Sequence, residues 1–187
     1  MQTITIEGLP RQEQGSRAAH RLRREGWVPA ALYGQGGPRL FKVKHTVAEK
    51  IVFTSQVYLV ELDMGDLHQT ALLREYQLHP VHDYILHLDF WGVAPEDEVT
   101  VSLPIRLVGT AEGVQMGGKL VPLLRRLKVR GRIQELPDAI EIDITPLKLG
   151  KSLTAGKVSV PNLTIVTPGD AAIARIEIPR ALRTQQG

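Results

Sequence analysis

The chain has 187 residues, 43% of them hydrophobic and 23% charged, which is the composition of a globular protein and excludes a disordered chain. It contains no cysteine, which excludes disulfides and cysteine-ligated zinc or iron–sulfur sites, and it has no apolar run of about 18 residues that would cross a membrane. We therefore expect a cytoplasmic protein of one large or two small domains, without a secretory signal at its start.

The net charge of +3 is unevenly distributed along the chain. Residues 1–44 carry eight basic and three acidic side chains, whereas residues 45–95 carry two basic and seven acidic ones. Such segregation indicates a local basic surface near the N-terminus rather than general basicity.

The first half of the chain mostly alternates between apolar and polar residues, which predicts strands over residues 2–7, 40–44, 57–63 and 67–78. The last two form a hairpin around Met64-Gly65-Asp66. Two short helices interrupt the strands. Ser16 is a suitable N-cap for residues 17–25 and Gly26 a suitable C-terminal residue, while Thr46 is a suitable cap for residues 47–55.

The first of these helices carries an arginine stripe. Arg17, Arg21 and Arg24 recur at helical spacing with His20 beside them, and Arg23 lies off this stripe. Like charges so spaced repel by about a few tenths of a kcal/mol per pair, and a row of phosphates would offset that cost. A guanidinium group also binds phosphate oxygens in a bidentate way, so the stripe predicts RNA binding, with a solvated basic helix face as the alternative.

Residues 84–92, YILHLDFWG, predict a half-buried strand. We expect Leu86, Leu88 and Phe90 on its inner face, and Ile85, His87, Asp89 and Trp91 on its outer face. A histidine and a carboxylate would then lie about 7 Å apart on that outer face.

Residues 92–100 contain Pro95 and three consecutive acidic residues, and we interpret them as a linker. This gives a first domain over residues 1–93 and a second over residues 97–187. The second domain alternates over residues 99–109, 126–133, 139–144, 162–166 and 171–179, so it is predicted to be β-rich with at most one short helix.

A second basic stripe, formed by Arg126, Lys128, Arg130 and Arg132, lies on one predicted strand of this second domain. It either pairs with Glu141 and Asp143 across strands or contacts RNA, and we favour the pairing.

Two observations limit the chemistry. His79, His87 and Asp89 would be the ligands of a metal-dependent hydrolase, but their spacing matches no recognised ligand set, so no metal, cofactor or enzymatic activity is expected. Only nine residues are aromatic, so a bound RNA should be structured and read through its shape and backbone. Tyr33 is the exception, because its hydroxyl or ring can either contact a nucleotide or pack on the sheet.

Several segments together resemble one family. Residues Pro10 to Gly34, Tyr76 to Pro80 and Leu86 to Phe90 are similar to bacterial large-subunit ribosomal protein twenty-five, whose two-domain members are called general stress protein Ctc. Residues 109–120 and 144–153 are similar to the C-terminal domain of that family, so the resemblance extends over essentially the whole chain.

The resemblance implies a mainly β protein with an N-terminal six-stranded β-barrel, two or three short helices and a β-rich C-terminal domain. It also implies a structural constituent of the large ribosomal subunit whose barrel binds 5S rRNA at its loop E region, with Arg11, Arg23, Tyr33, His87 and Asp89 as contact residues. To these the helix spacing adds Arg17, His20, Arg21 and Arg24. The C-terminal domain would contact other large-subunit components. A protein-interaction module without RNA remains an alternative.

Overall fold

The computed structural model describes residues 1–34, 37–65 and 67–179, which form two compact units, residues 1–97 and the residues from 98 onward. Asp66 of the predicted turn lies outside the described residues. Each unit has its own sheets and its own buried residues, and each is described here by itself.

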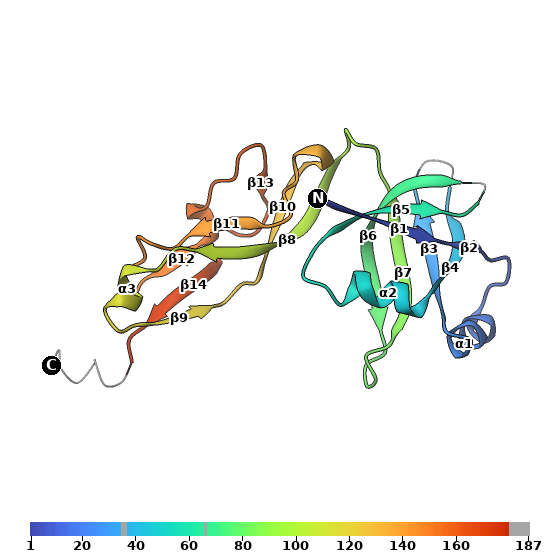
Figure 1. Ribbon diagram of the computed structural model, residues 1–187, viewed down its shortest axis with the longest axis horizontal. Coiled ribbons are helices and arrows are strands. Elements are labelled where there is room, and N and C mark those ends of the chain that lie inside the picture. The colour runs from blue at the N-terminus through green and yellow to red at the C-terminus, as the bar shows by residue number, and fades with distance from the viewer. Residues whose placement is uncertain (35–36, 66, 180–187) are drawn as a thin grey trace. The chain divides into compact units, whose positions relative to one another are not determined.

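Unit 1 is built on a curled mixed sheet in the order β1-β5-β6-β7-β3-β4-β2 (Figure 1). The β1–β5 and β3–β7 pairs are parallel, and the other neighbours are antiparallel. Among the described residues, six longer strands account for the predicted barrel, and a two-residue strand adds one edge. The strands are β1 (Gln2–Glu7), β2 (Leu9–Pro10), β3 (Trp27–Tyr33), β4 (Arg39–Lys44), β5 (Tyr58–Asp63), β6 (His68–Leu78) and β7 (Ile85–Gly92).

The inner face of this sheet forms a continuous apolar core. Val28, Phe41, Leu88 and Phe90 are fully buried, and the rings of Phe41 and Phe90 lie 5.7 Å apart. Burial of each such side chain contributes about 1.5–3 kcal/mol to the free energy of folding. Alternation in the sequence places these side chains on one face of the sheet, and the sheet curls around them.

Two helices lie against the sheet, α1 (Ser16–Arg24) beside β3 and α2 (His45–Val52) beside β4 (Figure 1). Both predicted caps are wrong, since the N-cap residues are Gly15 and Lys44 and neither helix has a side-chain cap hydrogen bond. The predicted end of α1 is confirmed, because Gly26 has a φ of +80°, the left-handed conformation that glycine adopts after a helix.

Strand β7 departs from the predicted alternation at its first two residues. Ile85 is fully buried, whereas Leu86 is only partly buried, so their predicted faces are exchanged. The reason is a shift in register with β6: Gln77 lies opposite His87, but Leu78 lies opposite Ile85. This irregularity leaves Leu86 without a partner residue in β6 and turns the strand from there on.

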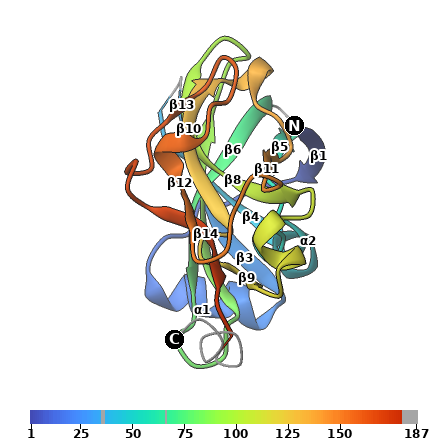
Figure 2. The ribbon, with the colours of Figure 1, turned by 90° about the vertical axis from the view of Figure 1, so that its left-hand side faces the viewer.

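Unit 2 contains two sheets, β11-β8-β10-β13 and β12-β14-β9 (Figure 2). Its four-residue helix α3 (Glu112–Gln115) lies beside β9, and two 3-10 turns, η1 (Ile133–Glu135) and η2 (Ala155–Lys157), complete the described elements. The strands are β8 (Glu98–Val108), β9 (Lys119–Pro122), β10 (Arg126–Arg132), β11 (Ile140–Asp143), β12 (Ser152–Thr154), β13 (Thr164–Ile165) and β14 (Ala172–Glu177).

The glycine-rich segment around α3 packs closely against residues 148–149. A Cβ atom added to Gly113 would lie 2.5 Å from the backbone nitrogen of Leu149, and one added to Gly118 would lie 2.5 Å from the carbonyl oxygen of Gly113. These glycines therefore permit a close backbone approach inside unit 2.

The basic stripe of β10 is exposed, as predicted, while Leu127 and Val129 between its members are buried. The predicted pairing with Glu141 and Asp143 is wrong, because β8 lies between β10 and β11. Arg130 instead pairs with Glu98 of β8 at 2.8 Å. Hydrogen bonds from the Thr145 side chain, and then from its backbone, hold the pKa of Asp143 below its ordinary value.

None of the helices within the described ranges has both the length and the apolar character that crossing a membrane requires.

Candidate RNA-binding surface

His87 and Asp89 lie together on the outer face of β7. Leu88 and Phe90 between and beyond them are fully buried, so the alternating side chains point outward. The Nδ1 atom of His87 lies 3.4 Å from the Oδ1 atom of Asp89, and the two side chains are 23% and 21% exposed. The carboxylate oxygen therefore lies close enough to Nδ1 to orient the imidazole.

Arg23 joins α1 to this strand. Its Nε and one terminal nitrogen both donate to the carbonyl oxygen of Leu86, at 3.1 and 3.0 Å. That carbonyl belongs to the residue at the register shift and precedes His87 directly. The helix and the outer face of β7 are thus linked at one point, although 63 positions separate the two residues in the chain.

Arg11 lies beside Arg23. Burial, and after it the charge of Arg23, lowers the pKa of the Arg11 guanidinium below its ordinary value. The Nε atom of Arg11 is buried and has no hydrogen-bond partner among the described residues. A guanidinium nitrogen without a partner, with a second positive charge acting on it, favours an anion as its acceptor.

The predicted stripe on α1 is exposed at Arg17, His20, Arg21 and Arg24, while Ala18, Ala19 and Leu22 on the opposite side are half-buried. Arg21 forms an ion pair with Glu13, which the sequence interpretation did not include. The stripe therefore presents Arg17, His20 and Arg24, together with a partly neutralised Arg21.

Tyr33 ends β3 and is 40% exposed. In the parallel β3–β7 pair Ala31 lies opposite Asp89 and Tyr33 lies opposite Trp91, so Tyr33 shares the outer face with Asp89. His87, Asp89 and Tyr33 are thereby brought onto one face of two adjacent strands.

The predicted alternative of a metal site does not form. His79 lies in the turn between β6 and β7, where its Nδ1 atom accepts hydrogen bonds from the backbone nitrogens of Val81 and His82 at 3.2 and 3.3 Å. Its ring stacks on Tyr84 with centroids 4.6 Å apart. In the part of the chain that the structure describes, no three histidine or carboxylate side chains gather in a way that could hold a metal ion.

Sequence reasoning missed two groups at this surface, the Leu86 carbonyl and the Glu13 carboxylate. No local pattern could identify the first, because it depends on the register of β6 against β7. Glu13 lies eight residues before Arg21, outside the helix itself, where helical spacing has no meaning.

Comparison with known proteins shows the family to which the chain belongs. Residues 6–90 match the model of the ribosomal L25p family, and residues 98–180 match the model of the C-terminal domain of ribosomal protein TL5. The chain is 37% identical over 185 residues to the large ribosomal subunit protein bL25 of Porphyromonas gingivalis, covering 98% of this chain and 96% of that protein. It is 35% identical over 190 residues to the protein of the same name from Phocaeicola vulgatus, with the same two coverages. These matches show that the chain belongs to the ribosomal L25p family and is a structural, non-enzymatic constituent of the large ribosomal subunit.

Proposed function

We propose that unit 1 binds 5S rRNA at its loop E region, through one surface made of the outer face of the β3–β7 pair and helix α1. As a large-subunit protein the chain has ribosomal RNA and other ribosomal components as partners and works in the cytoplasm of the bacterial cell. The identity of the RNA and its region comes from the family resemblance of residues 10–34, 76–80 and 86–90. The contact residues come from that resemblance and from the geometry described above.

The observation that supports this proposal most is the buried Nε atom of Arg11, which has no hydrogen-bond partner among the described residues. Burial, and after it the charge of Arg23, also lowers the pKa of Arg11. Arg23 keeps a fixed position because it donates twice to the Leu86 carbonyl. A phosphate group accepts from guanidinium groups and neutralises both charges, so the pair is suited to a backbone phosphate.

The other side chains of this surface add contacts that depend on the shape and the bases of the RNA. His87, oriented by Asp89, donates from Nε2 when that atom carries a proton, and a phosphate oxygen or a 2′-hydroxyl group can accept. A carboxylate near RNA accepts a hydrogen bond from a base amino group, which a duplex-like element presents along its grooves. Arg17, His20 and Arg24 extend the basic surface along α1.

The proposal is tested by measuring the affinity of the full chain for 5S rRNA over a range of salt concentrations. Neutralising about five phosphates gives a slope of log Kobs against log salt of roughly −4. Arg23→Ala and His87→Ala should each weaken binding by about 1–3 kcal/mol. Arg23→Lys keeps the charge but loses the planar fork, so it should fall between wild type and alanine.

The matched control is Arg175→Ala, which removes an exposed arginine of unit 2 that is paired with Glu177. It should leave the affinity unchanged. A slope near zero, or full affinity in both the Arg23 and His87 variants, would reject the proposal and favour a protein-interaction role for unit 1.

A further inference from the structure

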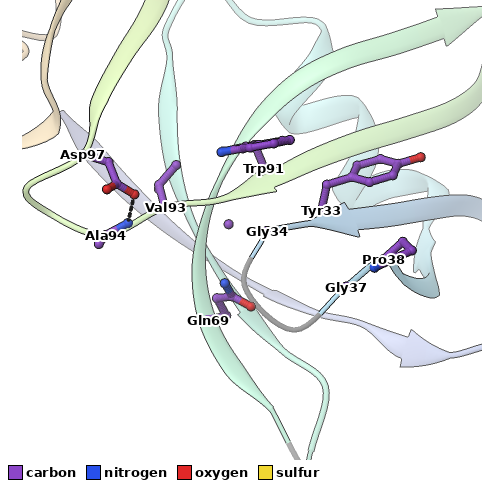
Figure 3. A pocket seen from close by; sticks show the side chains of 10 residues that line it. Tyr33, Gly34, Gly37, Pro38, Gln69, Trp91, Val93, Ala94 and Asp97 are labelled. Carbon is purple, nitrogen blue, oxygen red and sulfur yellow. Dashed lines mark hydrogen bonds between the residues drawn. The ribbon is translucent and has the colours of Figure 1, made fainter.

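A hollow of about 540 Å³ opens at the end of the β3–β7 pair, within unit 1. Among its lining residues are Tyr33 and Trp91, the glycines that follow them, Gln69 of β6 and Asp97 (Figure 3). A volume of this size lies within the range of roughly 300–1,000 Å³ that small organic ligands occupy, and it exceeds the volume of a single nucleobase.

Two aromatic rings border the hollow. Tyr33 and Trp91 lie opposite each other in the parallel strand pair, and Figure 3 shows their side chains next to each other. They are 40% and 42% exposed, so both rings can be reached from outside the protein. The guanidinium of Arg74 lies over the Trp91 ring, 4.9 Å from its centroid, and places a positive charge beside the ring.

The two strands that border the hollow end close together. A Cβ atom added to Gly34 would lie 3.3 Å from the Cα atom of Gly92, and one added to Gly92 would lie 2.2 Å from the side-chain nitrogen of Gln69. The missing side chain of Gly92 thus leaves room for the Gln69 side chain on the inner face of β7.

Gln69 and Asp97 border the hollow away from the rings. Gln69 lies opposite the buried Leu62 in the β5–β6 pair, so its half-buried side chain points to the inner face of the sheet, whereas Trp91 is on the outer face. Asp97 at the rim accepts from the backbone nitrogen of Ala94 at 2.7 Å through one oxygen (Figure 3).

We propose that the outer face at the rim of this hollow receives one unpaired base of the bound RNA, with the Trp91 ring as its stacking surface. The inference rests on the proposed RNA binding, and it adds a base-stacking site to a surface that otherwise contacts backbone and shape. Continuity supports it, since His87, Asp89 and Trp91 are successive outward residues of one strand. A base turned out of the RNA beside Asp89 therefore arrives at the Trp91 ring.

Fluorescence provides a direct test, because the chain has two tryptophans, Trp27 and Trp91. In a full-length Trp27→Phe variant, Trp91 is the sole tryptophan, and titration with 5S rRNA should quench its emission as a base stacks on it. Trp91→Ala should weaken 5S rRNA binding about 5- to 150-fold, the range for loss of one base–aromatic stack. Trp91→Phe, which keeps a ring, should recover part of this loss.

Phe53 provides the matched control, since it is a 56% exposed aromatic residue next to α2 and not part of the hollow. Phe53→Ala should bind 5S rRNA like wild type. Gln69→Ala changes a side chain on the inner face of the sheet and should also bind 5S rRNA like wild type.

The outcomes separate this inference from the proposed function. If Trp91→Ala binds with wild-type affinity, the hollow takes no base, whether or not Trp91 fluorescence changes, and the proposed function stands. If Trp91→Ala weakens binding but the Trp91 emission of the Trp27→Phe variant does not change, the ring acts on the fold and the inference is again overturned. If the wild-type chain does not bind 5S rRNA, both proposals fail.

Discussion

Arg11 and Arg23 are two arginines of the proposed RNA-binding surface that differ in their hydrogen bonds. Arg23 is fixed by two hydrogen bonds to one carbonyl, whereas the buried Nε atom of Arg11 has no hydrogen-bond partner in the described part of the chain. Buried polar groups are normally satisfied, and an exception in a folded protein often marks a place that a ligand completes. Sequence spacing identified the helix arginines, but it could not show that Arg11 approaches Arg23.

Replacing Arg11 by methionine tests this interpretation. Arg11→Met removes a desolvated charge and its repulsion with Arg23, so we expect the Tm of the free protein to stay the same or rise. We expect 5S rRNA binding to weaken by about 1–3 kcal/mol in the same variant. Thermal unfolding and RNA titration measure the two effects, and a clear fall in Tm together with unchanged RNA affinity would mean that Arg11 serves the fold.

At the scale of elements, the register shift at the start of β7 determines where the surface lies. It buries Ile85 and frees the Leu86 carbonyl for Arg23, beside the outward His87 and Asp89. A regular strand would bury Leu86 and expose Ile85, as the alternation in the sequence predicts. The irregularity is not visible in the sequence because it depends on how β6 pairs with β7.

Truncation of these two side chains checks the assignment. Ile85→Ala should lower the free energy of unfolding by about 2–5 kcal/mol, because it empties a fully buried position. Leu86→Ala should cost clearly less, because Leu86 is only partly buried and its carbonyl remains to accept from Arg23. Chemical denaturation gives both values, and the reverse order would contradict the shift.

For the whole molecule, the division into two units with separate buried residues locates the proposed function in unit 1. Phe41, Leu88 and Phe90 belong to the core of unit 1, while Leu127 is fully buried in unit 2. Each unit carries a basic surface, but the residues of the 5S rRNA proposal all lie in residues 1–97.

Leu127→Ala tests this location. It should destabilise unit 2 by about 2–5 kcal/mol through the cavity that it leaves. The affinity of the full chain for 5S rRNA should change by less than about twofold, because sites without shared partners usually contribute additively. Calorimetry and RNA titration of the same variant show both effects. A loss of affinity as large as that expected for Arg23→Ala would mean that unit 2 also takes part.

The sequence by itself determined what depends on residues near one another in the chain. Helical spacing predicted the exposed stripe of α1, alternation predicted the exposed cations of β10, and the hairpin of β5 and β6 followed from two strand patterns around a turn. These features follow from the periodicity with which side chains point along a helix or a strand, and that periodicity depends only on residues close together in the chain. The sequence resemblance also named the family.

Only the tertiary structure decided which distant residues meet. It joined Arg23 to the Leu86 carbonyl, placed β8 between the stripe of β10 and the acidic residues of β11, and set Tyr33 opposite Trp91. Each of these outcomes depends on strand order and register, which are selected by burial of the whole core rather than by any local pattern.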